Sequence, residues 1–186
     1  MLALLEVARA GVHDAEVMPF GVAWTDLPSP EFERSFLRFF WSARVSWTAT
    51  AWQLPLAVVL DGLPIGIQEV MATDFPTRRA VRTGSWLGRS YQGRGIGTEM
   101  RAAALFLAFD GLGALAAESG ALEGNTASAR VSQKLGYAPN GETLVAPRGS
   151  PVVEHRFILR RANWRRDLLP VVIESLQPCL PMFGLA

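Results

Sequence analysis

The stretch Gln92-Gly93-Arg94-Gly95-Ile96-Gly97-Thr98 is the most informative part of the sequence. It lies between a strand-like segment, Val81 to Leu87, and a helix-like segment, Gly97 to Leu112. Glycines let successive backbone N–H groups turn toward one point, and the positive end of the following helix favours an anion. The order strand, glycine loop, helix therefore predicts a cradle for phosphate.

A second informative block follows about thirty residues later. Asn125-Thr126-Ala127-Ser128 opens a short helix that ends with Leu135-Gly136-Tyr137. Asn is a preferred helix N-cap and Ser in the first turn satisfies a free backbone donor, so the block alone indicates only a capped helix. Its position after the second strand of the unit changes this interpretation. Together the two blocks favour a nucleotide-containing cofactor.

Two other nucleotide-binding patterns compare poorly with the glycine loop. A nicotinamide-binding unit is a fair rival, because Glu118 lies near the end of the next strand, where such folds place a ribose-binding carboxylate. Its third glycine is missing, however, and the motif comes after some ninety residues of unrelated pattern. A phosphate loop of the GxxxxGK type is excluded more firmly, since no Lys follows the glycines.

Composition bounds the class of protein. With 186 residues and 49% hydrophobic content, the chain is long enough for one ordinary core. Its net charge of +1 recommends neither nucleic acid nor an anionic membrane as a partner. The lone Cys179 fits a reducing compartment, and no segment has the roughly 18 apolar residues of a spanning helix. We expect a cytoplasmic protein.

Periodicity predicts the elements of a single α+β domain, with a mixed, mostly antiparallel sheet and helices on both faces. The expected strands run over 54–60, 64–73, 80–88, 114–120, 142–146 and 152–159. The expected helices begin near Met1, at Pro30, at Gly97 and at Asn125. We expect the domain to span residues 1–167. The apolar, proline-broken tail 168–186 is expected to cover a hydrophobic patch on its own domain or on a second subunit of a homodimer.

These residues resemble a known family. Gln92-xx-Gly95-x-Gly97 is similar to the pyrophosphate-binding signature of the GNAT superfamily of acyl-CoA N-acyltransferases, and the block from Asn125 to Tyr137 is similar to that superfamily's next motif. Ser85-Trp86-Leu87-Gly88 and Trp164 resemble its branch of ribosomal-protein N-terminal acetyltransferases. The resemblance covers about Leu54 to Trp164.

The resemblance implies where acetyl-CoA, as co-substrate, would bind. The sheet would splay open between the strands ending at Gly88 and Gly120, and the pantetheine arm would lie in the gap. Asn125 would contact the pantetheine, and Ser128 would lie near the sulfur. The backbone residues implied to pair with the arm are Leu87, Gly88 and Arg89. Those implied to hold the pyrophosphate are Gln92, Gly93, Arg94, Gly95, Ile96, Gly97 and Thr98.

The sequence departs from the family in three places. The usual first strand before the first helix is absent, because Met1 opens directly into helix-like sequence. A tyrosine acid of many members, seven residues after the Asn, is Ser132 here. The carboxylate that related sequences carry on the strand before the loop is replaced by Arg82. The usual acid and base assignment is therefore open.

Acyl transfer to an amine needs a base, because the amine is mostly ammonium at neutral pH. Glu118 is the first candidate, at the expected mouth of the gap. Glu69 is the second, and alternation places it and Gln68 on opposite faces of their strand. By resemblance, Ser128 is the candidate proton relay to the leaving group. His13, His155 and a single Cys have no recognisable metal-site spacing, so we expect no metal.

The sequence thus predicts an N-acyltransferase that moves an acetyl group from acetyl-CoA to a primary amine by direct attack in a ternary complex. The amine, from a protein N-terminus, a lysine or a small molecule, is left open. A succinyl-CoA-dependent enzyme and a non-catalytic CoA-binding module remain alternatives. The aromatic residues Phe20, Trp24, Phe39, Phe40 and Trp41 are expected in the core, with Phe20 or Trp24 as candidates to line the acceptor pocket.

Overall fold

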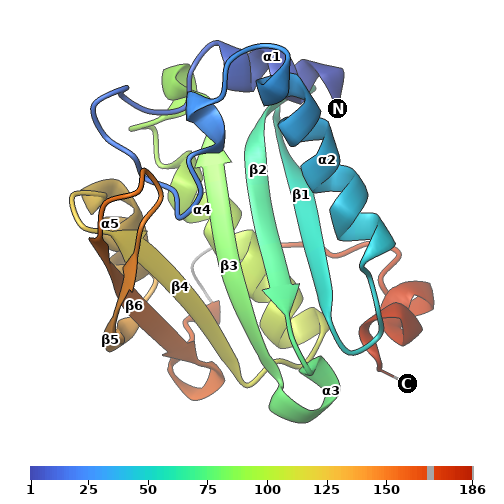
Figure 1. Ribbon diagram of the computed structural model, residues 1–186. Helices are drawn as coiled ribbons and strands as arrows, with labels where there is room; N and C mark the ends of the chain where they lie inside the picture. The colour runs from blue at the N-terminus through green and yellow to red at the C-terminus, as the bar shows by residue number, and fades with distance from the viewer. Residues whose placement is uncertain (167–169, 186) are drawn as a thin grey trace.

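The computed structural model describes residues 1–166 and 170–185. Its centre is a six-stranded sheet in the order β1-β2-β3-β4-β6-β5 (Figure 1). β3 and β4 run parallel, and the other neighbours are antiparallel. The strands are β1 (Trp52–Leu60), β2 (Leu63–Ala72), β3 (Ala80–Leu87), β4 (Ala116–Leu122), β5 (Ala138–Val145) and β6 (Val152–Arg160). The predicted mixed, mostly antiparallel sheet is confirmed.

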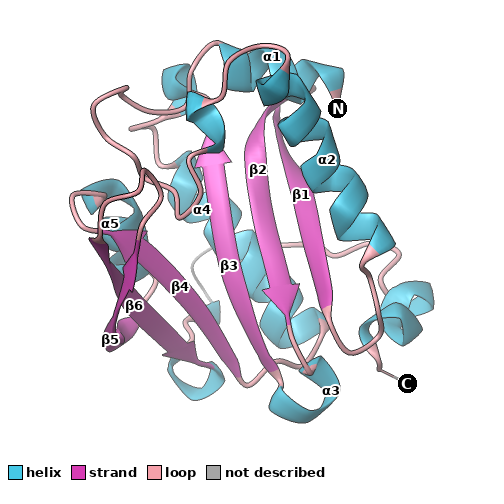
Figure 2. Ribbon diagram, viewed as in Figure 1, coloured by secondary structure: helices cyan, strands magenta, loops and turns pink. Residues whose placement is uncertain are grey.

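Helices cover both faces of this sheet, as Figure 2 shows. The helices are α1 (Leu2–Arg9), α2 (Glu31–Val45), α3 (Phe75–Arg78), α4 (Ile96–Phe106) and α5 (Thr126–Lys134). A π-helical turn, Leu107–Gly111, continues α4. Short 3-10 helices lie at Trp24–Asp26, Arg89–Tyr91, Arg161–Asn163 and Gln177–Phe183.

α1 and α2 pack on one face, which we call the front. On α2, Phe32, Phe36 and Phe40 recur every four residues, so they form one apolar stripe that is buried with Ile67 of β2. Trp86 of β3 packs against the same cluster. The stripe therefore fixes which face of β2 and β3 points toward the front.

α4 packs on the opposite face, which we call the back. Its Ala102, Ala104 and Leu105 are buried in one cluster with residues of the three central strands, Val70, Val81 and Ala117. Small side chains let the helix approach the sheet closely, and the buried residues form the larger of the two core clusters. β1 and β2 are joined by Asp61-Gly62, both at positive φ, which is the hairpin turn that the sequence predicts.

The sheet opens between its two parallel strands. Only Ala80, Val81 and Arg82 of β3 pair with β4, although β3 continues to Leu87 and β4 to Leu122. The hydroxyl of Thr83 still donates to the carbonyl oxygen of Glu118 at 3.2 Å, and the two strands then diverge (Figure 1). The predicted splay of the sheet is confirmed.

Several boundaries and one packing prediction need correction. β4 begins and ends two residues later than expected, and β5 begins four residues earlier. Phe39 and Trp41 are exposed, because they lie outside the α2 stripe that faces the sheet. No strand precedes α2 in the described part of the chain, which agrees with the predicted absence of the family's first strand.

The C-terminal segment packs on its own domain where the structure describes it. Phe183 is buried against Trp47 and Trp52, and the indole N–H of Trp47 donates to the carbonyl oxygen of Met182 at 2.8 Å. The domain boundary predicted between residues 167 and 168 lies outside the described residues.

Candidate active site

The diverging ends of β3 and β4 form the centre of a cavity of about 730 Å³. The first turns of α4 and α5 line its back, and residues 12–21 reach it from the N-terminal region. An extended arm of a ligand can therefore lie between the strands and be approached from both faces. In this gap the backbones of β3 and β4 are not paired with each other, which leaves space for a ligand.

The glycine loop at the wide end of the gap has the conformation of an anion cradle. Gly93 and Gly95 have φ of 74° and 86°, which residues with a Cβ adopt only at a cost. Gly95 is also the N-cap position of α4, so the N-terminus of that helix opens onto the cavity. The predicted order of strand, glycine loop and helix is present.

Gln92 braces this loop. Its side-chain amide donates to the carbonyl oxygens of Val12 and Leu87, at 2.7 and 2.9 Å. The next backbone donors upstream are also engaged, because the N–H of Gly88 donates to Ile65 and the N–H of Arg89 to Gly11, both at 2.9 Å. These contacts fix the end of β3, and pairing of Leu87, Gly88 and Arg89 with a ligand stays a prediction.

Asn125 caps α5 as the sequence predicts, whereas the side chain of Ser128 satisfies no backbone donor of the helix. The side-chain oxygen of Asn125 accepts from the backbone N–H of Ser128 at 3.1 Å, and its amide nitrogen donates to the carbonyl oxygen of Pro19 at 3.3 Å. The hydroxyl of Ser128 donates to the carbonyl oxygen of Gly120 at 3.4 Å. Both residues line the cavity at the side of β4.

A buried polar cluster closes the narrow end of the gap at the back. Arg101 of α4 is 3% exposed and donates to the hydroxyls of Ser119 at 2.8 Å and Ser85 at 3.2 Å, one on each diverging strand. Ser132 of α5 is fully buried and donates to Ser119 at 3.2 Å. Burial lowers the pKa of Arg101 below its usual value, and the nearby Tyr137 opposes that change.

The front mouth of the gap is flanked by two carboxylates, each beside a glycine. A Cβ on Gly84 of β3 would lie 3.2 Å from Oε2 of Glu69, and a Cβ on Gly120 of β4 would lie 2.5 Å from Oε1 of Glu154. The two glycines thus leave room for carboxylates from the neighbouring strands β2 and β6. Glu154 also accepts from Arg82 at 2.7 Å.

The pKa of Glu69 is displaced from its usual value. Burial raises its pKa above the usual value, while a hydrogen bond from Gln53 and the charge of Arg82 lower it. Gln68 points to the back, where its amide donates to the carbonyl oxygens of Glu69 and Gly84. The predicted opposition of these two side chains is confirmed, and Glu69 is the one on the front.

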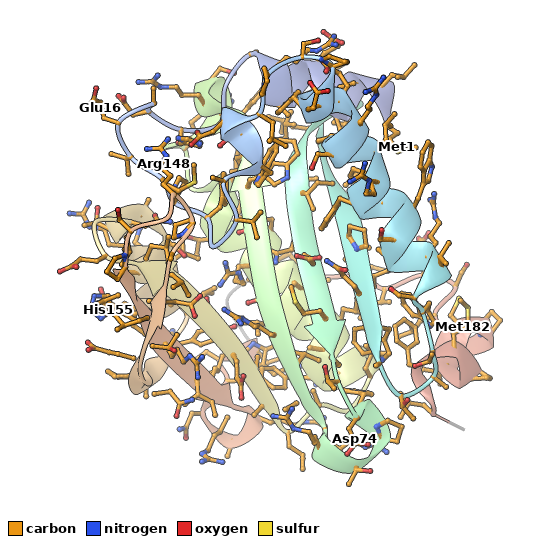
Figure 3. The ribbon with its side chains drawn as sticks, in the orientation of Figure 1. Met1, Glu16, Asp74, Arg148, His155 and Met182 are labelled. Carbon is orange, nitrogen blue, oxygen red and sulfur yellow. The ribbon has the colours of Figure 1, made fainter. Side chains whose placement is uncertain are left out.

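Residues 12–26 cross the front mouth and are tied down at several points. Arg148, labelled in Figure 3, lies between β5 and β6. It donates to both carboxylate oxygens of Asp26, at 2.6 and 2.9 Å, and to the carbonyl oxygen of Ala15 at 3.0 Å. Pro19 and Phe20 of this segment line the cavity. The segment therefore covers the side of the gap from which an acceptor would approach.

The cavity gathers many of the residues predicted for the site. Those that line it are Leu87, Gln92, Gly93, Gly95, Gly97, Thr98, Asn125 and Ser128. Gly88, Arg89, Arg94, Ile96 and Glu118 are not among its lining residues. Glu118 lies inside β4 opposite Arg82, where the strands are still paired, instead of at a strand end.

Sequence reasoning missed three of the site's features. Arg101 sits within the apolar helix pattern, and Glu154 lies on a strand that carries no motif. The sequence indicates a strand end at Gly120, although β4 continues to Leu122.

Within residues 1–166 and 170–185, no group of three or more His, Cys, Asp or Glu side chains is arranged to hold a metal ion. Nor does that part of the chain contain a helix with the length and apolarity to cross a membrane.

Comparison with known proteins agrees with this architecture. A family model described as Acetyltransferase (GNAT) domain matches residues 4–138. An acetyltransferase (GNAT family) from Bacillus anthracis superposes with a TM-score of 0.66 at 16% identity, covering 87% of this chain and 92% of that one. A ribosomal-protein-alanine N-acetyltransferase from Brucella melitensis gives 0.61 at 15%, covering 86% and 93%. RimJ of Mycobacterium smegmatis, in complex with CoA-disulfide, gives 0.59 at 20%, covering 70% and 61%.

Proposed function

We propose that this chain moves an acetyl group from acetyl-CoA to a primary amine, because it belongs to the Acetyltransferase (GNAT) domain family of acyl-CoA-dependent N-acyltransferases. The observation that carries the proposal is the gap between β3 and β4, which joins an anion cradle at the back to a pair of carboxylates at the front. A donor and an acceptor can meet in such a gap without a covalent intermediate on the protein.

The back of the gap would hold the donor. The N-terminus of α4 and the loop from Gly93 to Gly95 would bind the pyrophosphate, and Arg130 and Lys134, which line the cavity from α5, would add positive charge. The binding of CoA-disulfide by the similar fold of Mycobacterium smegmatis RimJ supports this assignment. Acetyl-CoA supplies the activated acyl group, and the chain supplies its position.

The front would bind and deprotonate the acceptor. An ammonium is attracted by the carboxylates of Glu69 and Glu154, which come from opposite sides of the mouth. Glu69 then accepts the proton, because burial raises its pKa toward that of a useful base. We propose Glu69 ahead of Glu118, because Glu69 lies beside Gly84, which lines the cavity, whereas Glu118 lies where β3 and β4 are still paired.

The remaining steps follow from geometry. Once neutral, the amine nitrogen attacks the acyl carbon, the carbon–sulfur bond breaks, and the sulfur receives a proton. Ser128 lines the cavity beside β4 and would relay that proton, as its resemblance to the family implies. The lone Cys179 lies in the C-terminal segment, away from the cavity-lining residues, so direct transfer in a ternary complex is the simplest route.

Two measurements test the proposal. Isothermal titration with acetyl-CoA is expected to show binding that CoA competes away, and absence of heat at sub-millimolar concentration would contradict it. Release of free thiol is then followed with a library of amines and peptides. Faster release from succinyl-CoA than from acetyl-CoA would favour the succinyl alternative. Binding without thiol release from either donor would leave a CoA-binding module.

A further inference from the structure

Arg101 is a buried cation with no matching anion. The residue is 3% exposed, and the groups to which its guanidinium donates, the hydroxyls of Ser85 and Ser119, are neutral. Among residues 1–166 and 170–185, no carboxylate forms an ion pair or hydrogen bond with it, and its buried Nε has no hydrogen-bond partner. A charge removed from water without a counter-ion is costly, so the arrangement is a poor choice for stability alone.

The position of Arg101 shows which part of a bound donor it faces. Ser119 directly follows Glu118, and Ser85 lies three residues beyond Arg82, so Arg101 bridges the two strands soon after their last pair, Arg82 and Glu118, toward the narrow end of the gap. The anion cradle lies at the wide end. An arm that starts at the cradle therefore ends near Arg101, and the end of the arm of CoA is its sulfur.

The face of the sheet distinguishes the sulfur from the acyl group. Arg101 approaches from α4 at the back, together with Ser132 of α5, whereas Glu69 and Glu154 define the acceptor mouth at the front. An acyl group must point toward the acceptor and away from Arg101. The sulfur, on which negative charge develops as the carbon–sulfur bond breaks, stays on the side of the guanidinium.

The structure also offers few other groups for this charge. Ser132, at the position of the family's tyrosine acid, is fully buried and already donates to Ser119. The titratable and charged groups that surround Arg101 are Tyr137 beside it, Arg130 and Lys134 on the cavity wall of α5, and Arg82 and Glu118 at the last pair of the strands. Arg101 is the cation among them that is fully withdrawn from solvent, so its field is the least screened.

We propose that Arg101 stabilises the thiolate of CoA as it leaves, in place of a general acid. The inference rests on the proposed function. The fixed positive charge of Arg101 lowers the proton affinity of the leaving sulfur. Oriented dipoles and charges stabilise developing charge in other enzymes in the same way. Protonation of the sulfur, directly or through Ser128, then follows after the bond has broken.

Titration of the bound thiol tests the proposal without turnover. The ultraviolet absorbance of the thiolate of CoA is followed against pH, free and bound to the wild-type protein, with desulfo-CoA as the ligand that lacks sulfur. We expect the pKa of the bound thiol to fall by about 1 to 3 units. Equal pKa values for bound and free CoA would overturn the inference, whatever any variant does. No binding of either ligand would overturn the proposed function as well.

Variants assign the effect to the residue. Arg101→Met keeps much of the length and removes the charge, so we expect the thiol pKa to return to that of free CoA and kcat to fall on the order of 100-fold. Lys134→Met removes an exposed cation of the same cavity, and it is expected to weaken CoA and desulfo-CoA equally while leaving the lowered thiol pKa in place. If Arg101→Met instead impairs succinyl-CoA far more than acetyl-CoA, the guanidinium binds an acyl carboxylate and the inference is wrong.

Discussion

The back and front of the gap are built in different ways. The back is formed by one nearly continuous piece of chain, from the glycine loop through α4, β4 and α5, and its features are glycine conformations, helix N-termini and one buried arginine. The front takes its groups from β2, β3, β6 and residues 12–26. A cofactor shared by a whole family can be bound by a fixed local sequence motif. An acceptor is bound by groups that only the tertiary fold brings together.

The largest expected effect is the loss of activity in Glu69→Gln, which tests whether the front of the gap acts separately from the back. Glu69→Gln keeps the shape and can still accept the hydrogen bond from Gln53, but it removes the base. We expect kcat to fall about 100- to 10,000-fold while the Kd for acetyl-CoA is unchanged. In the wild type, kcat/KM is expected to rise with pH through a pKa above 4.5, because the raised pKa of Glu69 must be passed before it accepts a proton. The variant loses that dependence.

Glu118→Gln is the matched control for this variant. Glu118 is the same residue type, on β4 two strands away and opposite Arg82, where β3 and β4 are still paired and the gap has not yet opened. We expect its kcat to stay near that of the wild type. A large loss in Glu118→Gln with little loss in Glu69→Gln would reverse the assignment of the base and restore the first interpretation of the sequence.

A smaller effect is expected on the back of the gap from Gly95→Ala. Gly95 has φ of 86°, and no atom lies within 4 Å of a Cβ placed on it, so the cost arises from the backbone alone. That cost is about 1–2 kcal/mol, so the Kd for acetyl-CoA is expected to rise roughly tenfold if the loop relaxes away from its cradle conformation. The pH dependence from Glu69 should not move. Titration calorimetry and a pH profile measure the two.

Gly149→Ala is the control for backbone strain. Gly149 has a similar φ of 79° and equally open surroundings, in the turn between β5 and β6. It is expected to lower stability by a similar amount with no change in the Kd for acetyl-CoA. If both variants weaken acetyl-CoA alike, the loss reflects general destabilisation, and the conformation of the glycine loop is not the cause.

Protein stability gives a further test of the front. The folded-state pKa of Glu69 is raised above its unfolded value of 4.5, so the protonated form favours the folded state. This contribution is fully present below pH 4.5 and is lost as the pH rises through the folded pKa. Melting temperatures of wild type and Glu69→Gln are therefore expected to be close in acid, with the variant becoming more stable than the wild type as the pH rises from 4.5 through the folded pKa. A difference that does not change with pH would show that the carboxylate is not buried.

The sequence predicts the back of the gap much better than the front, for a physical reason. A glycine loop before a helix and an Asn cap after a strand are local features, so Gly95, Gly97 and Asn125 are found without knowledge of the tertiary fold. Alternation shows that Gln68 and Glu69 point to opposite faces, but the choice depends on the aromatic stripe of α2, some thirty residues away. That long-range packing places Glu69 at the front.

The residues that were missed have no local signature. In the sequence, Gly120 looks like a strand end. The reason for a glycine at this position lies on the neighbouring strand, where Glu154 occupies the space that a Cβ would need. Glu154 looks like an ordinary strand residue until β6 pairs with β4. Arg101 lies among the buried apolar positions of α4, and a charged residue at such a position is the one local signal of its role. A charged residue amid buried helix positions is worth testing as a site residue in related chains.

The smallest expected effect concerns the segment over the front mouth. Arg148 holds Asp26 and Ala15, but the Arg148–Asp26 pair is more than one third exposed, so its removal in Arg148→Ala is expected to cost little stability. Residues 12–26 would then be less tightly held over the acceptor side, so KM for the amine is expected to rise a few-fold. The Kd for acetyl-CoA should not change, because the cradle lies at the back. Steady-state kinetics with varied amine measures the first, and calorimetry the second.

Arg34→Ala provides the comparison, since Arg34 forms an exposed ion pair with Glu31 on α2, and neither residue lines the cavity. It is expected to leave both constants unchanged. If Arg148→Ala weakens acetyl-CoA as much as it raises KM for the amine, residues 12–26 serve both substrates. The hydrogen bond between Asn125 and Pro19 would then be the physical link, because it joins this segment directly to the donor side. The separation of the two sides would in that case hold for catalysis by Glu69 but not for binding.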